Sequence, residues 1–570
     1  MINLEVTTDN NGKQSIKTSL SGKDLLTNPQ LNKSTAFTDD ERKAFGLIGK
    51  LPHRVETLEE QLDRAYQQFL HFEGNLQKNI YLNALLDINQ HLFYALVSRH
   101  LDEMMPVIYT PIVGNAVKQF SKEFRRPRGL YISYPDREHI RDMLRNRTNP
   151  HIDLIVVTDG EGVLGIGDQG IGGMDIPIAK LMVYTLCGGI SPFRTLPIQL
   201  DVGTNNETLL NDPLYLGWRE KRLSKEKYDE FIQMFVEIVT EEFPNLYLHW
   251  EDLGTRNARH NLEKYREQLC TFNDDMQGTG VVTLAVINAA TKALNEKMSD
   301  HRVVVYGAGA AGTGIAEQIY DVMRREGLSH EEAKSKFWLI DRYGLIKVGM
   351  DHLNDAKRFF ARDPAESADW AHGEDGFVNL ATTVDHVKPT ILIGCSAQSG
   401  AFTEGIIKHI AAHVEHPIIL PLSNPTEKAE ATPKDIMQWT NNKAYIATGS
   451  PFAPVKYEGI SYRIAQCNNA LVFPGIGLGV LACRATRLTD NMLWAACEAL
   501  SVCSPVLSDP TQPVLPTLSE APEIAKKIAA AVMRQAMDDG VADKQSDAEI
   551  EVLIKENFWQ PEYLPYELMG

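Results

Sequence analysis

Apolar residues recur three and four positions apart between Asp39 and His100, most regularly in the segments 55–72 and 79–101. This spacing places the apolar side chains on one face of a helix. We therefore predict a helical lobe near the start of the chain. The first 30 residues are polar and lack any such pattern, so we expect them to be irregular.

The pattern changes farther along, where short β-branched runs alternate with longer apolar segments. Residues 152–157 (IDLIVV) precede Thr-Asp-Gly, a glycine-rich stretch and an apolar run at 176–186. Similar short runs occupy 196–202 and 246–250. A strand, a loop and a helix in this order form the repeating unit of α/β folds, so we predict a central α/β domain.

A second α/β region begins after Asp275. An apolar helix is predicted over 281–294, and a continuous apolar strand, RVVVY, follows at 302–306. Further predicted strands alternate with helical stretches and occupy 337–340, 390–393 and 418–422. This alternation is typical of a doubly wound parallel sheet. The chain becomes helical again after Ala470.

Composition excludes several classes of protein and one class of partner. The 570 residues carry 57 Lys and Arg against 75 Asp and Glu, a net charge of −18, which argues against nucleic acid as a partner. The first 23 residues have no apolar core and no run of 18 apolar residues occurs, so we predict neither a signal peptide nor a membrane span. The seven cysteines are scattered without a CxxC pair, as expected of a reduced, cytoplasmic protein.

The glycine-rich segment after the 302–306 strand predicts a dinucleotide site. Gly307, Gly309 and Gly312 form a GxGxxG motif between a strand and a helix, where the backbone can approach a pyrophosphate. The next predicted strand ends in Asp341, whose carboxylate suits the ribose hydroxyls of NAD. The alternatives are a glycine turn that binds nothing, or NADP held by one of the nearby cations Arg342, Lys347 and Lys357, which also fit a solvated surface.

These patterns divide the chain into four parts. We expect a helical domain over 1–128 and a central α/β domain over 129–274, which the chain re-enters over 467–535. A Rossmann-type NAD-binding domain is expected over 275–466, and a tail over 536–570. The predicted fold class is α/β, with a doubly wound Rossmann-type domain, a second α/β domain and an N-terminal helical lobe. We expect the functional site in the cleft between the two α/β domains.

Two pairs of adjacent acids suggest a metal site. Glu251 and Asp252 follow a predicted strand, and Asp274 and Asp275 lie in the segment FNDDMQGTG. Carboxylates gathered in one cleft repel each other unless a cation neutralises them, and oxygen ligands favour Mg²⁺ or Mn²⁺ over zinc. Each pair on its own also fits a helix cap or a solvated loop, and their spacing does not show whether the pairs meet.

Several further polar residues allow two interpretations. Lys180 interrupts the apolar run IPIAKLMVYTL, and it either extends its ammonium group to the surface or is buried as a general base. Tyr109 in PVIYTPIVG fits simple packing as well as chemistry. The same ambiguity holds for three asparagines that fit turns or a binding site: Asn424, Asn468 and Asn469.

Taken together, long segments of the chain resemble those of the malic enzymes and occur in the same order. They are PVIYTPIVG, VVTDGEGVLGIGDQGIGGMDIPIAKL, LDVGTNNETLLNDPLYLGW, HWEDLGTRNA, FNDDMQGTG, VVVYGAGAAGTGIAEQI, PLSNPT, TGSPF and CNNALVFPGIGLG. The resemblance covers nearly the whole chain and is closest to the NAD-linked enzymes of bacteria and fungi. It implies an oxidoreductase that converts L-malate to pyruvate and CO₂, reduces NAD and depends on Mg²⁺ or Mn²⁺.

The resemblance also implies a role for each matching residue. Tyr109 matches the general acid and Lys180 the general base, with Asp274 supporting the lysine. The matching metal ligands are Glu251, Asp252 and Asp275, and the matching substrate-binding residues are Asn424, Asn468 and Asn469. The matching cofactor-binding positions are Gly307, Gly309, Gly312, Asp341, Asn257, Asp275 and Asn424, and Asp168 lies in a segment close to the cofactor. Family members form dimers or tetramers, so the resemblance implies a homo-oligomer, with a homotetramer as one form.

One position departs from the family pattern and keeps a second function open. Many malic enzymes have Glu-Arg where this chain has Glu161 and Gly162, so an arginine that would bind a malate carboxylate is missing. Malolactic enzymes, which are near relatives, also have glycine there and would release L-lactate and CO₂ while retaining NAD. The segments GDQGIGGM at 167–174 and TGSPF at 448–452 instead resemble malic enzymes.

Two rival classes fit less of the sequence. A catalytically silent nucleotide-binding protein would not need every acid, base and metal ligand that is present. An amino-acid dehydrogenase would account for the dinucleotide motif but not for the paired acids at 251–252 and 274–275. The sequence therefore favours a malic enzyme with a malolactic enzyme as the alternative.

Overall fold

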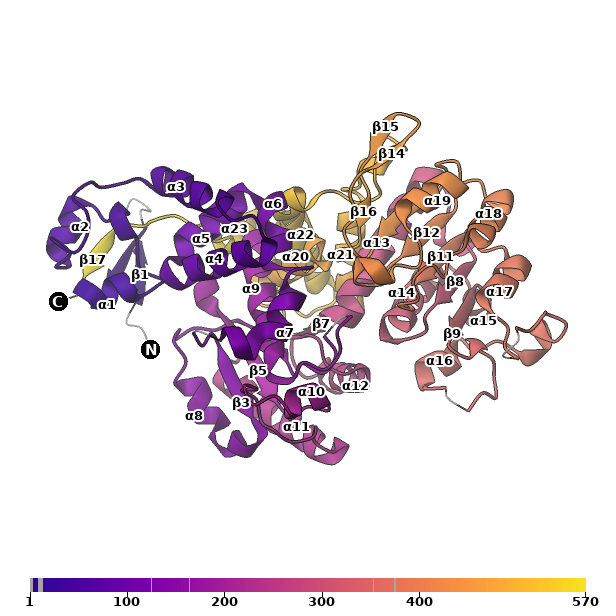
Figure 1. The fold of residues 1–570 in the computed structure, drawn as a ribbon, viewed down its shortest axis with the longest axis horizontal. Helices are drawn as coiled ribbons and strands as arrows, with labels where there is room; N and C mark the ends of the chain where they lie inside the picture. Colours follow the sequence, from indigo (N-terminus) through magenta and orange to yellow (C-terminus); the bar gives the residue numbers. More distant parts are fainter. Residues whose placement is uncertain are drawn as a thin grey trace. The chain divides into compact units, whose positions relative to one another are not determined.

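The computed structural model describes residues 4–8, 14–124, 126–163, 165–351, 353–373 and 376–569. The chain divides into two units. Unit 1 consists of Met1–Val163, Asp168–Leu248 and Lys555–Gly570, and unit 2 of Leu164–Gly167 and His249–Ile554. Figure 1 follows the chain through both units by colour, and each unit is described on its own.

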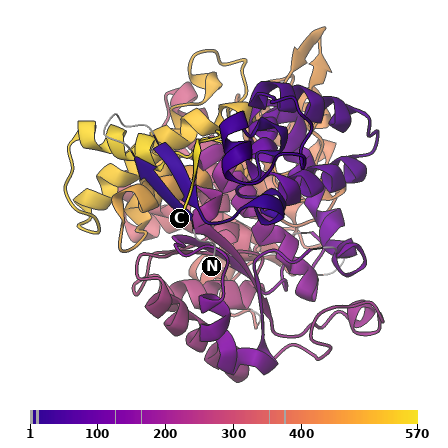
Figure 2. The same cartoon turned by 90° about the vertical axis from the view of Figure 1, so that its left-hand side faces the viewer.

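The two ends of the chain meet in a small sheet of unit 1. Strand β1 (Leu4–Thr8) is antiparallel to β2 (Gln14–Thr18), and β17 (Tyr566–Leu568) is parallel to β2. Figure 2 shows the yellow C-terminal strand beside the indigo N-terminal strands. The buried side chains of this part include Ile16 and Tyr566, together with others from 25–47 around the helices α1 (Gly22–Thr27) and α2 (Asp39–Ala44). The expectation that the first 30 residues are irregular is wrong for 4–8, 14–18 and 22–27, because β1 and a strand from the other end of the chain both pair with β2.

The predicted helical segments are confirmed as a series of helices in unit 1. They are α3 (Leu58–Leu70), α4 (Asn75–Ile88), α5 (Gln90–Arg99), α6 (Leu101–Ile108) and α7 (Val113–Glu123). Helix α3 begins at a capping box, in which Thr57 accepts from the Glu60 N–H and Glu60 accepts from the Thr57 N–H. Helix α6 ends at Tyr109, two residues before Pro111, so this tyrosine lies at a helix terminus.

Unit 1 also contains the first α/β part of the chain. The strands β3 (Leu130–Ser133), β5 (Thr195–Asp201) and β4 (Leu154–Thr158) are parallel and adjacent in that order. All five residues of β4 are buried, which explains its continuous apolar sequence. Helices α8 (Ile140–Arg145), α9 (Asp175–Gly188), α10 (Glu207–Leu210) and α11 (Lys225–Glu242) connect these strands, and β6 (Tyr247–Trp250) begins in unit 1 and ends in unit 2.

A seven-stranded sheet forms the centre of the predicted dinucleotide domain in unit 2. Its order is β10-β9-β8-β11-β12-β13-β16, and only β10 pairs antiparallel with its neighbour. The strands are β8 (Val303–Tyr306), β9 (Phe337–Asp341), β10 (Gly344–Leu345), β11 (Ile391–Gly394), β12 (Ile418–Pro421), β13 (Tyr445–Thr448) and β16 (Ala465–Gln466). The order reverses between β8 and β11, and ligands of such sheets bind at the carboxyl ends of the strands at this point.

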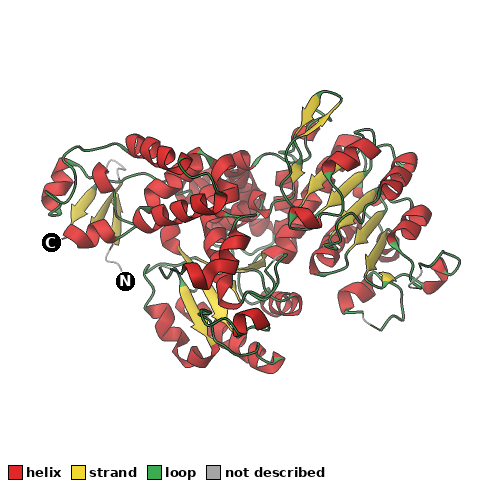
Figure 3. Ribbon diagram, in the orientation of Figure 1, coloured by secondary structure: helices red, strands yellow, loops and turns green. Residues whose placement is uncertain are grey.

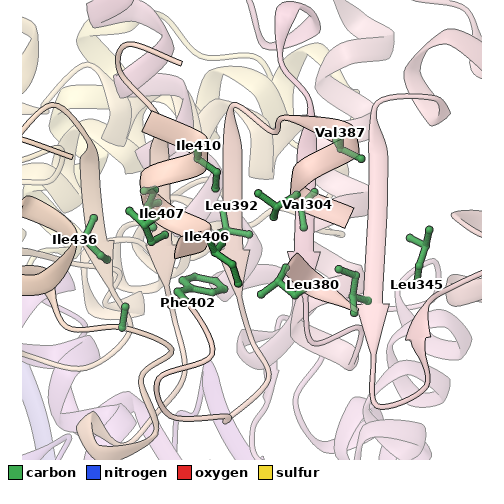
Figure 4. Close-up of a cluster of buried hydrophobic side chains, with 14 of the residues drawn as sticks. Val304, Leu345, Leu380, Val387, Leu392, Phe402, Ile406, Ile407, Ile410 and Ile436 are labelled. Atoms are coloured by element: carbon green, nitrogen blue, oxygen red, sulfur yellow. The ribbon is translucent and has the colours of Figure 1, made fainter. Parts of the chain in front are cut away.

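Helices cover the faces of this sheet and close its core. Side chains of β8, β11 and β12 pack against α17 (Leu380–Val387), α18 (Glu404–His413) and α19 (Pro433–Trp439), as Figure 4 shows for Val304, Leu392 and Ile407. Figure 3 shows these helices and α14 (Ala310–Arg325) on opposite sides of the strands. The smaller elements are α15 (His330–Lys334), α16 (Asp355–Phe359) and the hairpin of β14 (Val455–Tyr457) and β15 (Ile460–Tyr462).

The rest of unit 2 is largely helical. Helix α12 (Thr255–Tyr265) leads through β7 (Thr271–Asn273) to a π-helical turn (Asp274–Gly278) and α13 (Thr279–Leu294). The last helices are α20 (Phe473–Cys483), α21 (Asp490–Ser501), α22 (Ala521–Asp538) and α23 (Asp547–Asn557), which ends in unit 1. In the described part of the chain, no helix has the length and apolar character needed to cross a membrane.

Candidate active site

The glycine motif forms a tight turn between β8 and α14 in unit 2. Gly307 has φ of +109°, and a Cβ atom there would lie 2.3 Å from the carbonyl carbon of Cys395. A Cβ atom on Gly312 would lie 2.1 Å from the Gly307 oxygen, whereas Gly309 faces open space. The first and third glycines are therefore required by packing, and the second leaves room for a ligand at the N-terminus of α14.

Asp341 lies at the carboxyl end of β9, the strand adjacent to β8. Its Oδ1 atom accepts a hydrogen bond from the Tyr343 N–H at 2.8 Å, and its Oδ2 atom lies 2.7 Å from Lys357 Nζ. Of the three cations that the sequence raised as possible phosphate partners, Lys357 is the one that contacts this acid. Asp341, which can accept hydrogen bonds from a ribose, and Lys357, which could contact a 2′-phosphate, therefore lie side by side.

Three carboxylates meet in unit 2, as a metal site requires. Glu251 and Asp252 follow β6, and Asp275 lies in the turn before α13. One carboxylate oxygen from each residue lies within 4.8 Å of the others, and the Asp252 N–H donates to Asp275 Oδ2 at 2.8 Å. Asp252 has φ of +50°, a strained backbone position that holds its side chain in this group. Glu251 and Asp252 are buried and Asp275 is half-buried. This all-oxygen set of acids fits Mg²⁺ or Mn²⁺, because such a cation offsets their mutual repulsion.

Asp274 is fully buried beside Glu251, Asp252 and Asp275, which are called the acid triad below. It contacts Asn469 and lies close to His249 and Glu251, all in unit 2. Asn469 Nδ2 donates to Asp274 Oδ2 at 2.9 Å and to Thr279 Oγ1 at 3.1 Å. His249, Glu251 and Asp274 also have ligand atoms within 4.8 Å of one another, and His249 Nε2 lies 2.6 Å from Glu251 Oε2. His249 was not predicted from the sequence, although it lies on β6 two residues before Glu251, which directly follows the strand.

Tyr109 and Lys180 come together in unit 1. Lys180 Nζ lies 5.3 Å from the centre of the Tyr109 ring, and both side chains are buried. Lys180 is on α9, a helix that is buried on nearly every side, and this position excludes the interpretation that its ammonium group extends to the surface. A buried lysine beside a buried tyrosine offers one group that can take a proton and one that can give a proton.

The predicted asparagines lie in different settings. Asn424 is exposed and follows β12, and its Oδ1 atom accepts from Ser450 Oγ at 2.5 Å. Asn468 is buried and caps a short helical turn, accepting from the Ala470 N–H at 3.0 Å. Asn257 is half-buried on α12. Of the three substrate-binding candidates, Asn469 is thus the one that contacts the buried acids.

Asp168 anchors a loop of unit 1 through Arg222. Arg222 Nη2 and Nε donate to its two carboxylate oxygens at 2.8 and 2.9 Å, and the Asn205 N–H donates at 2.8 Å. Burial alone raises the pKa of Asp168, but the hydrogen bonds and charge of Arg222 outweigh burial, and the net pKa is lowered. In the neighbouring turn, the Glu161 N–H donates to Asp159 Oδ1, and Gly162 follows without a side chain.

Comparison with protein families identifies both α/β parts of the chain. Residues 87–266 match the family model described as the malic enzyme N-terminal domain. Residues 276–537 match the model described as the malic enzyme NAD binding domain. The two matches together span more than half of the chain. Glu251 and Asp252 lie within the first match, and Asp274 and Asp275 lie between the two.

Individual proteins give the same result. The chain is 50% identical over 548 residues to the NAD-dependent malic enzyme of Pseudomonas savastanoi pv. phaseolicola, covering 96% of this chain and 97% of that protein. It is 48% identical over 558 residues to the NAD-dependent malic enzyme of Acinetobacter baylyi, covering 98% of each. The fold resembles the crystal structure of Entamoeba histolytica malic enzyme, with a TM-score of 0.54 and 23% identity over 90% of this chain and 91% of that one. The chain therefore belongs to the malic enzyme family.

Proposed function

We propose that the protein oxidatively decarboxylates L-malate to pyruvate and CO₂ and reduces NAD. The observation that carries this proposal is the convergence of Glu251, Asp252 and Asp275 in the same unit as the dinucleotide turn. A metal-dependent reaction on a nicotinamide cofactor needs both features. The relatives that are about half identical to this chain are named NAD-dependent malic enzymes, which supports the same reaction.

The chain's own residues have distinct tasks in this proposal. Lys180 takes the proton of the C2 hydroxyl of malate, and Tyr109 later protonates the carbon that has lost CO₂. Asp274 supports the lysine, as the family pattern implies, and the asparagines 424, 468 and 469 bind and orient the substrate carboxylates. Glu251, Asp252 and Asp275 would hold a divalent ion, which would supply a positive charge at the C2 oxygen, and bound NAD would supply the hydride acceptor.

The remaining cofactor positions complete the assignment. The turn of Gly307, Gly309 and Gly312 lets the pyrophosphate bind at the N-terminus of α14. Asp341 accepts hydrogen bonds from the ribose hydroxyls. Asn257, Asp275 and Asn424 are assigned to the cofactor as well, by the family pattern. This assignment predicts a preference for NAD, because a carboxylate beside the ribose repels a 2′-phosphate.

A malolactic reaction is the second candidate, and Gly162 is the observation that favours it. Gly162 has no side chain to bind a malate carboxylate, whereas many malic enzymes have an arginine at this position. In that case the hydride would return to pyruvate and L-lactate would be released. The two reactions differ in whether NADH leaves the enzyme.

Absorbance at 340 nm separates the two candidates. Purified protein is given L-malate and Mn²⁺ with NAD or NADP in separate cuvettes, and pyruvate and lactate are assayed at the end. We expect NADH to grow steadily with NAD and to match pyruvate. Lactate without free NADH would establish the malolactic reaction and make Gly162 the decisive residue.

Cellular location, assembly and domain limits are further proposals. The seven cysteines, scattered without a CxxC pair, support a cytoplasmic protein. The family pattern supports a homo-oligomer, as a dimer or tetramer, and light scattering during gel filtration measures its mass.

The division at 128, 274, 466 and 535 is proposed as the domain organisation, and limited proteolysis tests it at these boundaries.

A further inference from the structure

Glu430 is a completely buried acid that the assigned chemistry does not use. It lies in unit 2 in the segment between β12 and α19, and its exposed fraction is 0%. A buried carboxylate is costly unless hydrogen-bond donors surround it, and removal of such donors leaves an uncompensated charge. The residues that donate hydrogen bonds to Glu430 are therefore the residues whose positions it fixes.

Two serines supply these donors. Ser396 donates to Glu430 Oε1 from both its N–H and its Oγ, each at 2.8 Å. Ser423 donates from Oγ to Oε1 at 2.5 Å, and from its N–H to Oε2 at 3.4 Å. Hydrogen bonds to an ionised acceptor are the strong class, so this carboxylate binds both serines firmly.

The serines begin two loops at the edge of the sheet where the ligand site is proposed. Ser396 follows β11 and Ser423 follows β12, both at the carboxyl ends of the parallel strands. The loops are tied to each other as well, because the Ala397 N–H donates to Ser423 Oγ at 2.8 Å. A Cβ atom on Gly394 would lie 2.5 Å from the Glu430 Cδ, so the end of β11 accommodates this acid only as glycine.

Each loop adjoins a proposed ligand contact. A Cβ atom on Gly307 would lie 2.3 Å from the Cys395 carbonyl carbon and 2.5 Å from the Ser396 N, so the first glycine of the turn rests on this peptide. Asn424 directly follows Ser423 and is held from its other side by Ser450. The carboxylate of Glu430 is thus linked to the dinucleotide turn through Ser396. Through Ser423 it is linked to Asn424, which is a proposed substrate-binding residue.

We propose that Glu430 is a positioning residue that sets the dinucleotide turn and Asn424 for binding. This inference rests on the proposed function, because it assumes that NAD and malate bind at this edge of the sheet. Its charge is essential, since both oxygens act only as acceptors. An amide at this position would point an N–H group at one or more of these donors.

The test is the affinity of the full-length protein for NADH, measured by fluorescence titration. For Glu430→Gln we expect the Kd of NADH and the KM of malate to rise by about tenfold or more, with a smaller change in kcat. Ser396→Ala and Ser423→Ala remove donors but leave the acid, and each is expected to raise the NADH Kd several-fold. Glu427→Gln is the matched control, because Glu427 is exposed in the same segment, and its Kd should equal that of the wild type.

A merely structural role predicts a different result. Glu430→Gln would then lower the melting temperature, while the NADH Kd of the folded protein would stay at the wild-type value, and this outcome overturns the proposal. If Glu430→Gln fails to fold, the two serine variants decide, and unchanged Kd values for both overturn it equally. Wild-type protein that does not bind NADH at all would instead overturn the proposed function together with the inference.

Discussion

At the scale of single residues, the acid triad is the proposed metal site. Glu251, Asp252 and Asp275 converge within 4.8 Å, and their negative charges repel each other when no cation is bound. A bound divalent ion should therefore stabilise the folded protein. We expect Mn²⁺ to raise the melting temperature of the wild type, and Asp275→Asn to abolish most of this rise together with activity.

Differential scanning fluorimetry with and without Mn²⁺ measures this effect. Glu427→Gln is again the control, since an exposed acid outside the triad should leave the metal-dependent shift unchanged. An Asp275→Asn protein that keeps the full shift would show that the ion binds elsewhere.

A second prediction concerns the choice of cofactor at Asp341. The Asp341→Ala change removes the ribose acceptor and leaves Lys357 beside the site without its partner. We expect the KM for NAD to rise by about tenfold, the size of one lost charged hydrogen bond, and the KM for NADP to fall. Steady-state kinetics with both cofactors measure the ratio, and an unchanged ratio would remove Asp341 from the ribose contact.

Sequence could indicate the acids because adjacent pairs and glycine spacing are visible along the chain. It could not show that 251–252 and 274–275 meet, and it left Lys180 with two interpretations until the burial of α9 was known. Glu430 and His249 were missed for a related reason. Glu430 lies outside every segment that carries the resemblance, and His249 is a lone histidine at the start of HWEDLGTRNA. The partners of Glu430 at 396 and 423 belong to other loops of the sheet edge.

At the scale of elements, close packing of α20 on α22 explains Gly475 and Gly479 in the segment FPGIGLGVLAC. A Cβ atom on Gly475 would lie 2.7 Å from Ile528 Cβ and 2.9 Å from the Ala525 oxygen. Gly475→Ala should therefore overpack this contact and lower the free energy of unfolding by roughly 1–3 kcal/mol. Gly405→Ala, in the first turn of α18, is the control, because nothing lies within 4 Å of its added carbon.

Thermal melting of both variants tests this packing. The control should melt at or slightly above the wild-type temperature, since alanine favours a helix over glycine. Equal melting temperatures for Gly475→Ala and the wild type would mean that α20 and α22 separate easily.

Periodicity predicted these elements well where a pattern is local. The helices between 58 and 99 and the strands near 303, 391 and 418 lie where the apolar spacing indicated. Strands β1 and β2 could not be predicted in this way, because β2 acquires a buried face only when Tyr566 and α1 pack against it. A strand of polar composition is recognisable only when its partner is known.

At the scale of the whole molecule, unit 1 joins the two ends of the chain through buried aromatic residues. The ring of His91 on α5 packs against Phe193, Trp559 and Tyr563. Burial, and secondly the charge of Lys33, lower the pKa of His91 to about 4. In the unfolded chain a histidine has a pKa of about 6.5.

This difference makes stability depend on pH. As the pH falls below about 6.5, His91 becomes protonated in the unfolded chain, whereas in the folded protein it stays neutral down to about pH 4. The free energy of unfolding therefore decreases as the pH falls through this range. For one histidine the loss is on the order of 1 kcal/mol at pH 5.5. We expect the melting temperature of the wild type to drop more between pH 7.5 and 5.5 than that of His91→Phe. Identical drops in the two proteins would contradict the buried, neutral state of this ring.

The central claim is that the protein oxidatively decarboxylates L-malate, with Lys180 and Tyr109 as its base and acid and with Glu251, Asp252 and Asp275 as its metal ligands. The most direct test measures NADH, pyruvate and CO₂ released from L-malate, NAD and Mn²⁺ by the wild type and by Lys180→Ala. The account predicts equal amounts of the three products from the wild type, and a loss of about 10²-fold or more in rate for the variant. Lactate in place of pyruvate and NADH, or full turnover by Lys180→Ala, would contradict it.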